Sequence, residues 1–416
     1  MKRICMFFAV FTAVAAGVYP QAQAGEANRI TAVSVSGLKR TKAHIIETPL
    51  AKYIGMDAGD VDANDVYAIV KSTGVLEPLS VEMPDNEGGA GKTLAVSVRD
   101  KWSIFPMPIV SVNSGGWSAG AALMDANAFG VKDTMMAVGM YGKGGILAMA
   151  MYINSPDGIG DIGWNIMGVF ALRENENLDQ TGETVLRRYN SMVIRPLAGL
   201  SYKLGEHITP NLNVSYRYIA LRETEAPVNA PEHGVQAVSV NPGINIQKDS
   251  TWDGYFLNET KAALNYEYTF VIDGADVHAV SLNAAFNHSL VPGFRFTAKS
   301  GAVAATSSAS PFLASSPREA AVNILPQAYS ATDFAGISLG FEKYLFKFTH
   351  GMIAVLAAYQ AVYSNGDLLA HQFDHGPAAM LLMYFSRLAL PALGLGGAYN
   401  VDKEAWQFAF NIGMSL

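Results

Sequence analysis

The chain has 416 residues, half of them hydrophobic, and a formal net charge of −7. This acidic balance argues against nucleic acid as a partner, because nucleic-acid binding depends on a basic surface. Beyond position 24 no apolar stretch approaches the roughly 18 residues of a membrane-spanning helix. The single cysteine, Cys5, indicates neither a disulfide nor a metal site nor a nucleophile.

The N-terminus has the pattern of a secretory signal peptide. Lys2 and Arg3 precede an apolar stretch at 4–18, and the small-residue sequence AQA ends at Ala24. We therefore predict that residues 1–24 are a cleaved signal peptide and that the mature protein is exported. A retained membrane anchor is the alternative, but the apolar stretch is short for a span of about 20 residues.

Residues 25–105 are predicted to form a small α+β domain. Its elements, in chain order, are a strand in RITAVSVSGL, helices in TKAHIIETPLAKYIGM and DANDVYAIVKSTGV, and strands in LEPLSVEMPD and KTLAVSVRDKW. Thr41 is a candidate N-cap of the first helix, and the second helix is predicted to begin at Asp62 or Asn64. Two prolines, Pro78 and Pro84, suit a strand only at a sheet edge, where the missing N–H groups are not needed.

From Pro106 onward the helical signals end and alternating strands follow. In NLNVSYRY, for example, Leu212 and Val214 alternate with Asn213 and Ser215, which is the pattern of a strand between lipid and a wet lumen. Sixteen such segments are predicted, at 107–113, 116–126, 133–142, 145–154, 161–173, 189–203, 209–222, 235–247, 259–270, 277–288, 293–305, 336–346, 351–364, 376–387, 390–400 and 404–416. An even number is typical of single-chain bacterial barrels. The predicted fold is therefore mainly β, with a sixteen-stranded antiparallel transmembrane barrel at 106–416. Polar residues of the later strands are assigned to its lumen, namely Asn283, Asn287, Arg295 and Lys299.

The connections between these strands alternate in length. The short ones, predicted as periplasmic turns, are 155–161, 203–210, 289–293 and 346–351. The long polar ones, predicted to face outward, are 174–188, 223–233, 306–335 and 364–375. The last segment is predicted to pair with the first and close the cylinder, leaving no open edge. Its apolar face carries Phe408, Phe410, Ile412 and Leu416, and Gly413 weakens its packing.

Three short motifs imitate catalytic or binding sites. GWSAG, with Ser118 at its centre, matches a hydrolase nucleophile elbow, but an elbow needs a strand-to-helix turn, whereas this segment continues as a strand. GGAGKT imitates a phosphate loop but precedes a strand rather than a helix. His371 and His375 lie near Asp374 in a predicted loop, where histidines are more often solvated than bound to metal. We expect no catalytic residue, no cofactor and no metal.

Both parts of the chain resemble a known superfamily. VSVSGLKRTK, STGVLEPLSVE and LAVSVRDKWSIFPMP, in this order, resemble a polypeptide-transport-associated (POTRA) domain and its junction to a barrel. The barrel segments NAFGVKD, MYINSPD, QKDSTWDGYFLNETKAALNYEY and FAFNIGMSL are similar to those of the outer-membrane assembly and translocation superfamily, the bacterial surface antigen family. Each motif is weak alone, and their order carries the resemblance over nearly the whole mature chain.

The resemblance implies a loop that folds into the lumen and carries an arginine paired with an acidic residue. The matching position in PFLASSPREAAVN is Arg318, although Pro317 and Glu319 differ from the family's flanking residues. Glu342 is the nearest candidate acid, since the segment 351–364 contains none. The alternative is a solvated loop arginine.

The predicted barrel indicates a protein of the bacterial outer membrane with residues 25–105 in the periplasm, and the resemblance implies that it inserts or translocates client polypeptides. Clients would add as strands to the edge strand 76–85, at Leu79, Val81 and Met83, and to the barrel seam. Expected partners are outer-membrane lipids, client polypeptides and periplasmic or lipoprotein assembly factors. A passive diffusion channel and a membrane hydrolase using Ser118 are the alternatives.

Overall fold

A computed structural model describes residues 28–86, 91–113, 116–155, 161–253, 256–272, 274–306, 312, 315–317, 322–349, 351–366, 368–385 and 391–412. The predicted signal peptide lies outside these residues. The chain divides into two compact units between Lys101 and Trp102, and the first barrel strand begins at Ile104. The barrel unit therefore starts four residues before the predicted boundary at 105/106.

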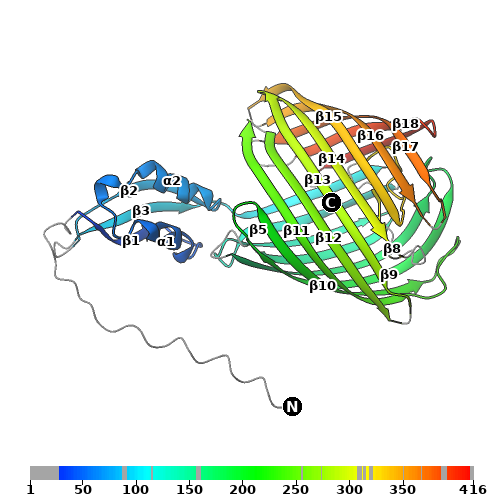
Figure 1. The fold of residues 1–416 in the computed structure, drawn as a ribbon, viewed down its shortest axis with the longest axis horizontal. Coiled ribbons are helices and arrows are strands. Elements are labelled where there is room, and N and C mark those ends of the chain that lie inside the picture. Colours follow the sequence, from blue (N-terminus) through cyan, green and yellow to red (C-terminus); the bar gives the residue numbers. More distant parts are fainter. Residues whose placement is uncertain are drawn as a thin grey trace, which may run out of the picture. The chain divides into compact units, whose positions relative to one another are not determined.

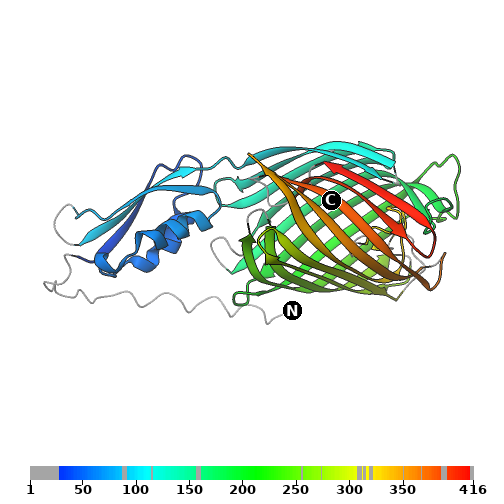
Figure 2. The ribbon, with the colours of Figure 1, turned by 90° about the horizontal axis from the view of Figure 1, so that it is seen from above.

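The N-terminal unit is a three-stranded sheet with helices on one face (Figures 1 and 2). Its elements are β1 (Ile30–Ser36), α1 (His44–Leu50), η1 (Ala51–Tyr53), η2 (Ala58–Asp60), α2 (Ala63–Ser72), β2 (Leu76–Glu82) and β3 (Lys92–Asp100). The strand order is β1-β3-β2, with β1 parallel and β2 antiparallel to β3. The sheet and helices enclose a core of buried side chains that includes Ile46, Leu50, Val66, Val70 and Leu94. This arrangement confirms the predicted β-α-α-β-β order and the edge position of β2.

Asp100, at the end of β3, organises the segment before α1. Its carboxylate accepts hydrogen bonds from the backbone N–H groups of Lys39, Arg40 and Thr41 and from the Thr41 hydroxyl. Burial alone would raise the pKa of Asp100, but these hydrogen bonds outweigh it and hold the pKa below its ordinary value. Thr41 is therefore not the predicted N-cap of α1, which begins at His44 with no side-chain cap. Asp62 does cap α2, accepting from the Asn64 N–H at 2.8 Å.

The second unit is a closed barrel of sixteen strands joined in antiparallel register (Figure 1). Its strands are β4 (Ile104–Asn113), β5 (Gly116–Ala128), β6 (Asp133–Gly142), β7 (Gly145–Asn154), β8 (Ile162–Leu178), β9 (Val185–Tyr202), β10 (Ile208–Arg222), β11 (Val235–Asp253), β12 (Phe256–Ile272), β13 (Val277–Val291), β14 (Phe294–Ala305), β15 (Asp333–Phe348), β16 (Gly351–Asn365), β17 (Gln372–Phe385), β18 (Pro391–Asn400) and β19 (Ala405–Ile412). The predicted fold class and strand number are confirmed. The prediction ended β11 at 247 because the next residues are polar, whereas pairing with β12 continues to Asp253↔Phe256.

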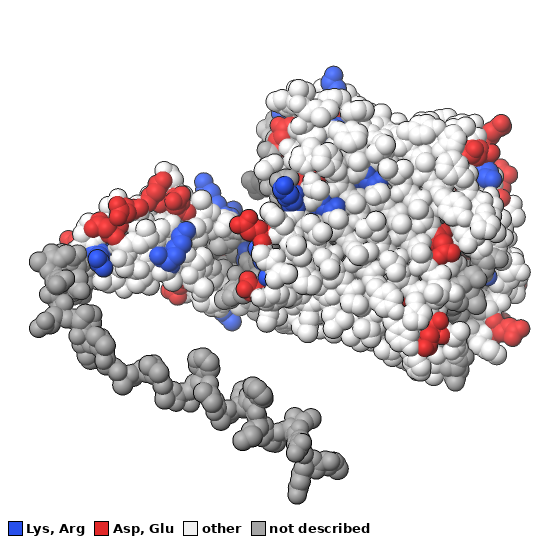
Figure 3. All heavy atoms as spheres, in the orientation of Figure 1, with Lys and Arg blue, Asp and Glu red and all other residues white. Residues whose placement is uncertain are grey.

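The outer surface of the barrel is apolar. Leu212, Ile244 and Leu264 point outward and are 43–51% exposed, as expected of side chains that face lipid. Figure 3 shows that most of the visible barrel surface carries no charged side chain. Among the described residues, no helix is both long and apolar enough to cross a membrane.

Because neighbouring strands are antiparallel, successive connections lie at opposite ends of the barrel. We call the end at which β4 begins the entry end and the opposite end the far end. The four predicted short turns all lie at the entry end, around 155–161, 203–207, 292–293 and 349–350. The four predicted long connections all lie at the far end, around 179–184, 223–234, 306–332 and 366–371. The predicted grouping of these eight connections at two ends is therefore confirmed. Length alone does not separate the ends, because the far end also holds the turn 143–144 between β6 and β7. The periplasmic and outward assignment stays a prediction.

Candidate functional site in the lumen and at the barrel seam

The inner face of β10–β13 is lined by amide side chains, which we call the amide wall: Asn211, Asn213, Asn241, Asn245, Asn265 and Asn283. Their outward neighbours, such as Leu212 and Leu264, are among the exposed apolar side chains. Two glycines make room for these amides. A Cβ at Gly199 would lie 2.1 Å from Asn213 Oδ1, and one at Gly243 would lie 2.1 Å from Asn265 Oδ1. The predicted polar lumen is confirmed for this part of the barrel.

The inner face of β4–β9 is different, because it carries an apolar band, with Asn165 and Arg195 as polar members of the flanking rows. One row crosses these six strands in direct register, and its members are Phe105, Met124, Met136, Met151, Met167 and Leu197. Three more methionines lie on the same face. The row next to this one contains Met107 and Met149, and the row after that contains Met140. We call these nine side chains the methionine wall. The sequence prediction did not identify it, although the signal was present: DTMMAVGMYG and GILAMAMYIN contain almost no polar residue on either face.

A buried ion pair joins β14 and β15 inside the barrel. Arg295 Nη2 and Nε lie 2.6 and 2.9 Å from Glu342 Oε2, and the Tyr384 hydroxyl donates to Glu342 Oε1 at 2.6 Å. The Arg295 guanidinium also lies 4.6 Å from the centre of the Phe256 ring. Glu342 is 1% exposed, so its charge depends on these partners.

This network bears on the predicted contact between Arg318 and Glu342. Arg318 lies outside the described residues, so its contact stays a prediction. Glu342 faces the lumen as predicted, but both of its oxygens already accept hydrogen bonds from Arg295 and Tyr384. The sequence could not reveal Arg295 as the partner, because the pairing depends on the Arg295↔Glu342 register between β14 and β15.

Part of the long connection after β14 lies inside the barrel. Within this loop segment, 322–332, Val322, Ile324 and Leu325 are fully buried and belong to a cluster with Val362 and Ala378 from the inner faces of β16 and β17. Hydrogen bonds add to this packing: the Tyr329 hydroxyl lies 2.7 Å from Ser364 Oγ, and the Asn323 N–H donates to Gln360 Oε1 at 2.7 Å. The sequence signal for this burial was the group of apolar residues in VNILPQAYS. The segment narrows the lumen.

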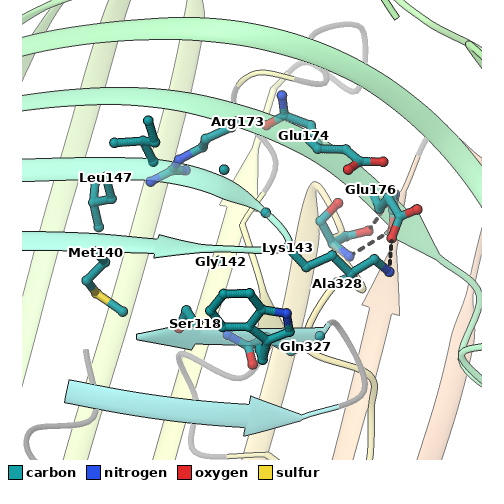
Figure 4. A pocket seen from close by; sticks show the side chains of 18 of the residues that line it. Ser118, Met140, Gly142, Lys143, Leu147, Arg173, Glu174, Glu176, Gln327 and Ala328 are labelled. Atoms are coloured by element: carbon teal, nitrogen blue, oxygen red, sulfur yellow. Dashed lines mark hydrogen bonds and ion pairs between the residues drawn. The ribbon is translucent and has the colours of Figure 1, made fainter. Parts of the chain in front are cut away.

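A cavity of about 480 Å³ lies at the far end of the barrel, between the loop segment and the inner faces of β5–β9 (Figure 4). Lys143 reaches toward Glu176 at 3.4 Å, and Arg188 Nη2 contacts the same carboxylate at 2.8 Å. Ser118 lines this cavity near the start of β5, paired with Ser111 and Gly142. It is not at a strand-to-helix turn, so the geometry of a nucleophile elbow is missing and the hydrolase alternative loses its basis.

The seam joins the last strand to the first. Among the described residues, which end at Ile412, β19 pairs with β4 from Ala409↔Asn113 to Ile412↔Val110. β4 also contains Pro106 and Pro108, which lack N–H donors and are typical of edge strands. The predicted closure by the last strand is confirmed, and Phe408 points outward at 63% exposure. Gly413 and Leu416 lie outside the described residues.

β2 is an edge strand of the N-terminal sheet, as is β1. Of the three predicted client-binding side chains, Leu79 is 53% exposed, whereas Val81 and Met83 pack partly against the domain core. The register with β3 shifts between Pro78 and Ser80. A client that adds here would therefore bind mainly through backbone hydrogen bonds, with Leu79 as an accessible side chain.

Comparison with known proteins finds similarity in structure and not in sequence. No family model matches the chain, and no curated protein matches its sequence. The crystal structure of BamA from Haemophilus ducreyi lacking POTRA domains 1–3 is similar over 94% of this chain and 86% of that one, with a TM-score of 0.63 and 13% identity. CdiB from Escherichia coli matches over 94% and 77%, with a TM-score of 0.61 and 12% identity. CdiB from Acinetobacter baumannii matches over 93% and 74%, with a TM-score of 0.59 and 12% identity. The chain therefore has the fold of BamA and CdiB, which confirms the resemblance at the level of fold.

Proposed function

We propose that this protein resides in the bacterial outer membrane, with its N-terminal unit in the periplasm, and inserts or translocates client polypeptides by strand addition. The fold that it shares with BamA and CdiB supports this proposal. The observation that carries it is the seam at which the last strand pairs with the first, because the first strand contains two prolines that lack N–H donors. Outer-membrane lipids and client polypeptides are the proposed partners, together with periplasmic or lipoprotein assembly factors.

The seam suits strand addition because opening it exposes unpaired N–H and C=O groups. A typical backbone hydrogen bond contributes only about 0.5–1.5 kcal/mol net, so each hydrogen bond of the seam is opened at a modest cost. An extended client segment that pairs with β4 or β19 restores those hydrogen bonds. The edge of β2 offers the same kind of pairing outside the barrel, before the client reaches the seam.

A reversible disulfide across the seam tests the proposal. Ser111 and Asn411 are directly opposite each other in the β4–β19 register, where Cβ atoms lie about 4.5–5.5 Å apart. The double change Ser111→Cys and Asn411→Cys in the mature chain, which lacks the Cys5 segment, introduces only these two thiols. A matched control places the disulfide at Ser215 and Ser239, which are opposite each other in β10 and β11.

The assay follows the folding of an eight-stranded test barrel into liposomes that contain the purified protein. We expect the oxidised seam variant to lose its acceleration of folding, reduction to restore it, and the control disulfide to leave it unchanged. Equal acceleration by the oxidised seam variant and the control would show that the seam does not open during function.

A passive diffusion channel is the second candidate, favoured by the polar amide wall. It requires an open lumen, whereas the loop segment 322–332 packs inside the barrel against β16 and β17. Planar-bilayer recordings separate the two functions. A steady large conductance of the unmodified protein would support the channel, whereas a low conductance that rises when the loop segment is removed would support a blocked lumen.

A further inference from the structure

The methionine wall is unusual for its position. The interior of a transmembrane barrel is ordinarily polar, because it is filled by water or by polar side chains. Here the row from Phe105 to Leu197 places apolar side chains on six adjacent inner faces without a polar member. Apolar surface that meets water without being covered is energetically unfavourable, and extended apolar patches mark binding surfaces.

The methionine wall combines buried side chains with side chains that are accessible from the lumen. Ile109, Ala122 and Val138 are at most 4% exposed and form its base together with Met136. Met107 and Met151, like the remaining methionines of the wall, are only partly buried. The buried side chains of the loop segment 322–332 belong to a different cluster, against β16–β18.

The choice of methionine indicates an adaptable surface. Leucine or valine fills a fixed core well, whereas the unbranched thioether of methionine adjusts to differently shaped partners and is over-represented on promiscuous binding surfaces. A wall that contains Met124, Met136, Met151 and Met167 side by side therefore suits partners that share apolar character but not one sequence.

The amide wall follows the methionine wall around the lumen and has complementary chemistry. The side chains of Asn241, Asn265 and Asn283 make no hydrogen bond to another residue in the part of the chain that the structure describes. Each amide carries two donors and an acceptor, so this surface suits polar side chains and peptide groups of a partner. The lumen thus offers an adaptable apolar surface next to a polar one, in which the Arg217–Glu267 pair lies among the amides.

We propose that the methionine wall binds the apolar face of an extended client segment whose apolar and polar residues alternate, while the amide wall contacts its polar face. This inference rests on the proposed function and names the class of its substrate. Strand side chains point alternately to opposite faces, so only an alternating segment presents both surfaces at once. The wall begins on β4, the strand that also forms the seam, so it is continuous with the proposed site of strand addition.

A peptide-binding experiment on the full-length mature protein in detergent micelles tests this inference. The probes are two fluorescent twelve-residue peptides of identical composition, one alternating valine with threonine and the other carrying all valines before all threonines. The test variant combines Met136→Asn with Met151→Asn, two neighbours in one row. The matched control combines Met136→Leu with Met151→Leu, which keeps the apolar surface. Circular dichroism and resistance to unfolding at room temperature verify that each barrel has folded.

We expect the alternating peptide to bind the unmodified protein and the leucine control, and to bind the asparagine variant about tenfold more weakly, a loss of about 1.4 kcal/mol. The block peptide is expected to bind weakly to all three proteins. Equal binding of both peptides to the unmodified protein would show that the lumen does not select segments with alternating apolar and polar residues. Equal binding of the alternating peptide to the asparagine variant would overturn the role of the wall.

A second measurement covers the case in which the asparagine variant does not fold. A photoreactive benzoyl-phenylalanine is placed at Met151 on the inner face of β7, or at Ala150, the adjacent outward residue. Crosslinking of the alternating peptide at Met151 and not at Ala150 supports the inference, whereas equal or absent crosslinking at Met151 overturns it. The liposome folding assay is run in parallel: retained acceleration with no peptide binding rejects this inference alone, and loss of both rejects the proposed function as well.

Discussion

The two lumenal walls share one kind of outer face and differ on their inner face. Outward residues of the first strands, such as Ile146 and Ile166, are exposed to the same degree as Leu212 and Leu264 of the later strands. Facing inward, the first set carries methionines in register and the second carries asparagines. Lipid fixes the outer chemistry of every strand, whereas the inner chemistry is free to vary, so the inner face is where the function of this barrel is specified.

The buried ion pair on the polar side of the barrel gives the largest expected effect. Arg295→Ala or Glu342→Ala leaves the partner charge buried with only part of its hydrogen bonds, which costs about 3–5 kcal/mol of unfolding free energy. The double variant is expected to be no less stable than either single variant, because the stranded charge is removed with its partner. Urea unfolding in detergent micelles measures all three.

This experiment also tests whether the polar side of the lumen depends on paired charges. Glu267→Ala is the matched control, since Glu267 lies 3.9 Å from Arg217 and is more exposed than Glu342. A loss below about 1 kcal/mol is expected for it. If Glu342→Ala behaves like this control, the Arg295–Glu342 pair does not hold the two strands together.

The sequence predicted the strands well, but it did not predict which side chains from distant segments contact one another. β6 and β7 have the predicted bounds, because a tight glycine turn joins them and both strands have a regular outer face. The methionine wall escaped prediction for a physical reason: a strand that is apolar on both faces shows no alternation, so the lumenal side cannot be distinguished from the lipid side. The burial of Ile324 and the pairing of Glu342 with Arg295 depend on contacts between distant segments, which no local pattern contains.

On the apolar side of the lumen, Met136→Ala tests how tightly the methionine wall is packed. Met136 is 8% exposed and packs with Val138, Met124 and Met151. Removing its side chain loses buried apolar contacts and leaves a cavity, which costs about 2–5 kcal/mol for a methionine in a protein core. We expect the low end of this range in urea unfolding, because the neighbouring methionines can move into the space. A loss below about 0.5 kcal/mol would mean that the wall is loosely packed throughout.

The loop segment offers a smaller and more local effect. Tyr329→Phe removes the hydroxyl that contacts Ser364, whose side chain is fully buried. Loss of one such hydrogen bond costs about 1 kcal/mol, and the cost falls on the attachment of the loop rather than on the barrel. We therefore expect faster proteolysis within 306–332 and an unchanged urea midpoint. Unchanged proteolysis would show that packing by Ile324 and Leu325 holds the segment without this hydrogen bond.

The amide wall itself gives the smallest expected effect. Asn265 makes no hydrogen bond to another described residue, so Asn265→Ala is expected to change the unfolding free energy by less than about 0.5 kcal/mol. Gly243→Ala is expected to cost about 1 kcal/mol, because the new Cβ would lie 2.1 Å from Asn265 Oδ1 and 3.0 Å from Asn211 Oδ1. The double variant relieves the closer overlap and is expected to recover most of that stability, so the two changes are non-additive. If Gly243→Ala is equally destabilising with and without the Asn265 side chain, then Gly243 does not make room for the Asn265 amide. The asparagines of the amide wall would then not be positioned by the glycines beside them.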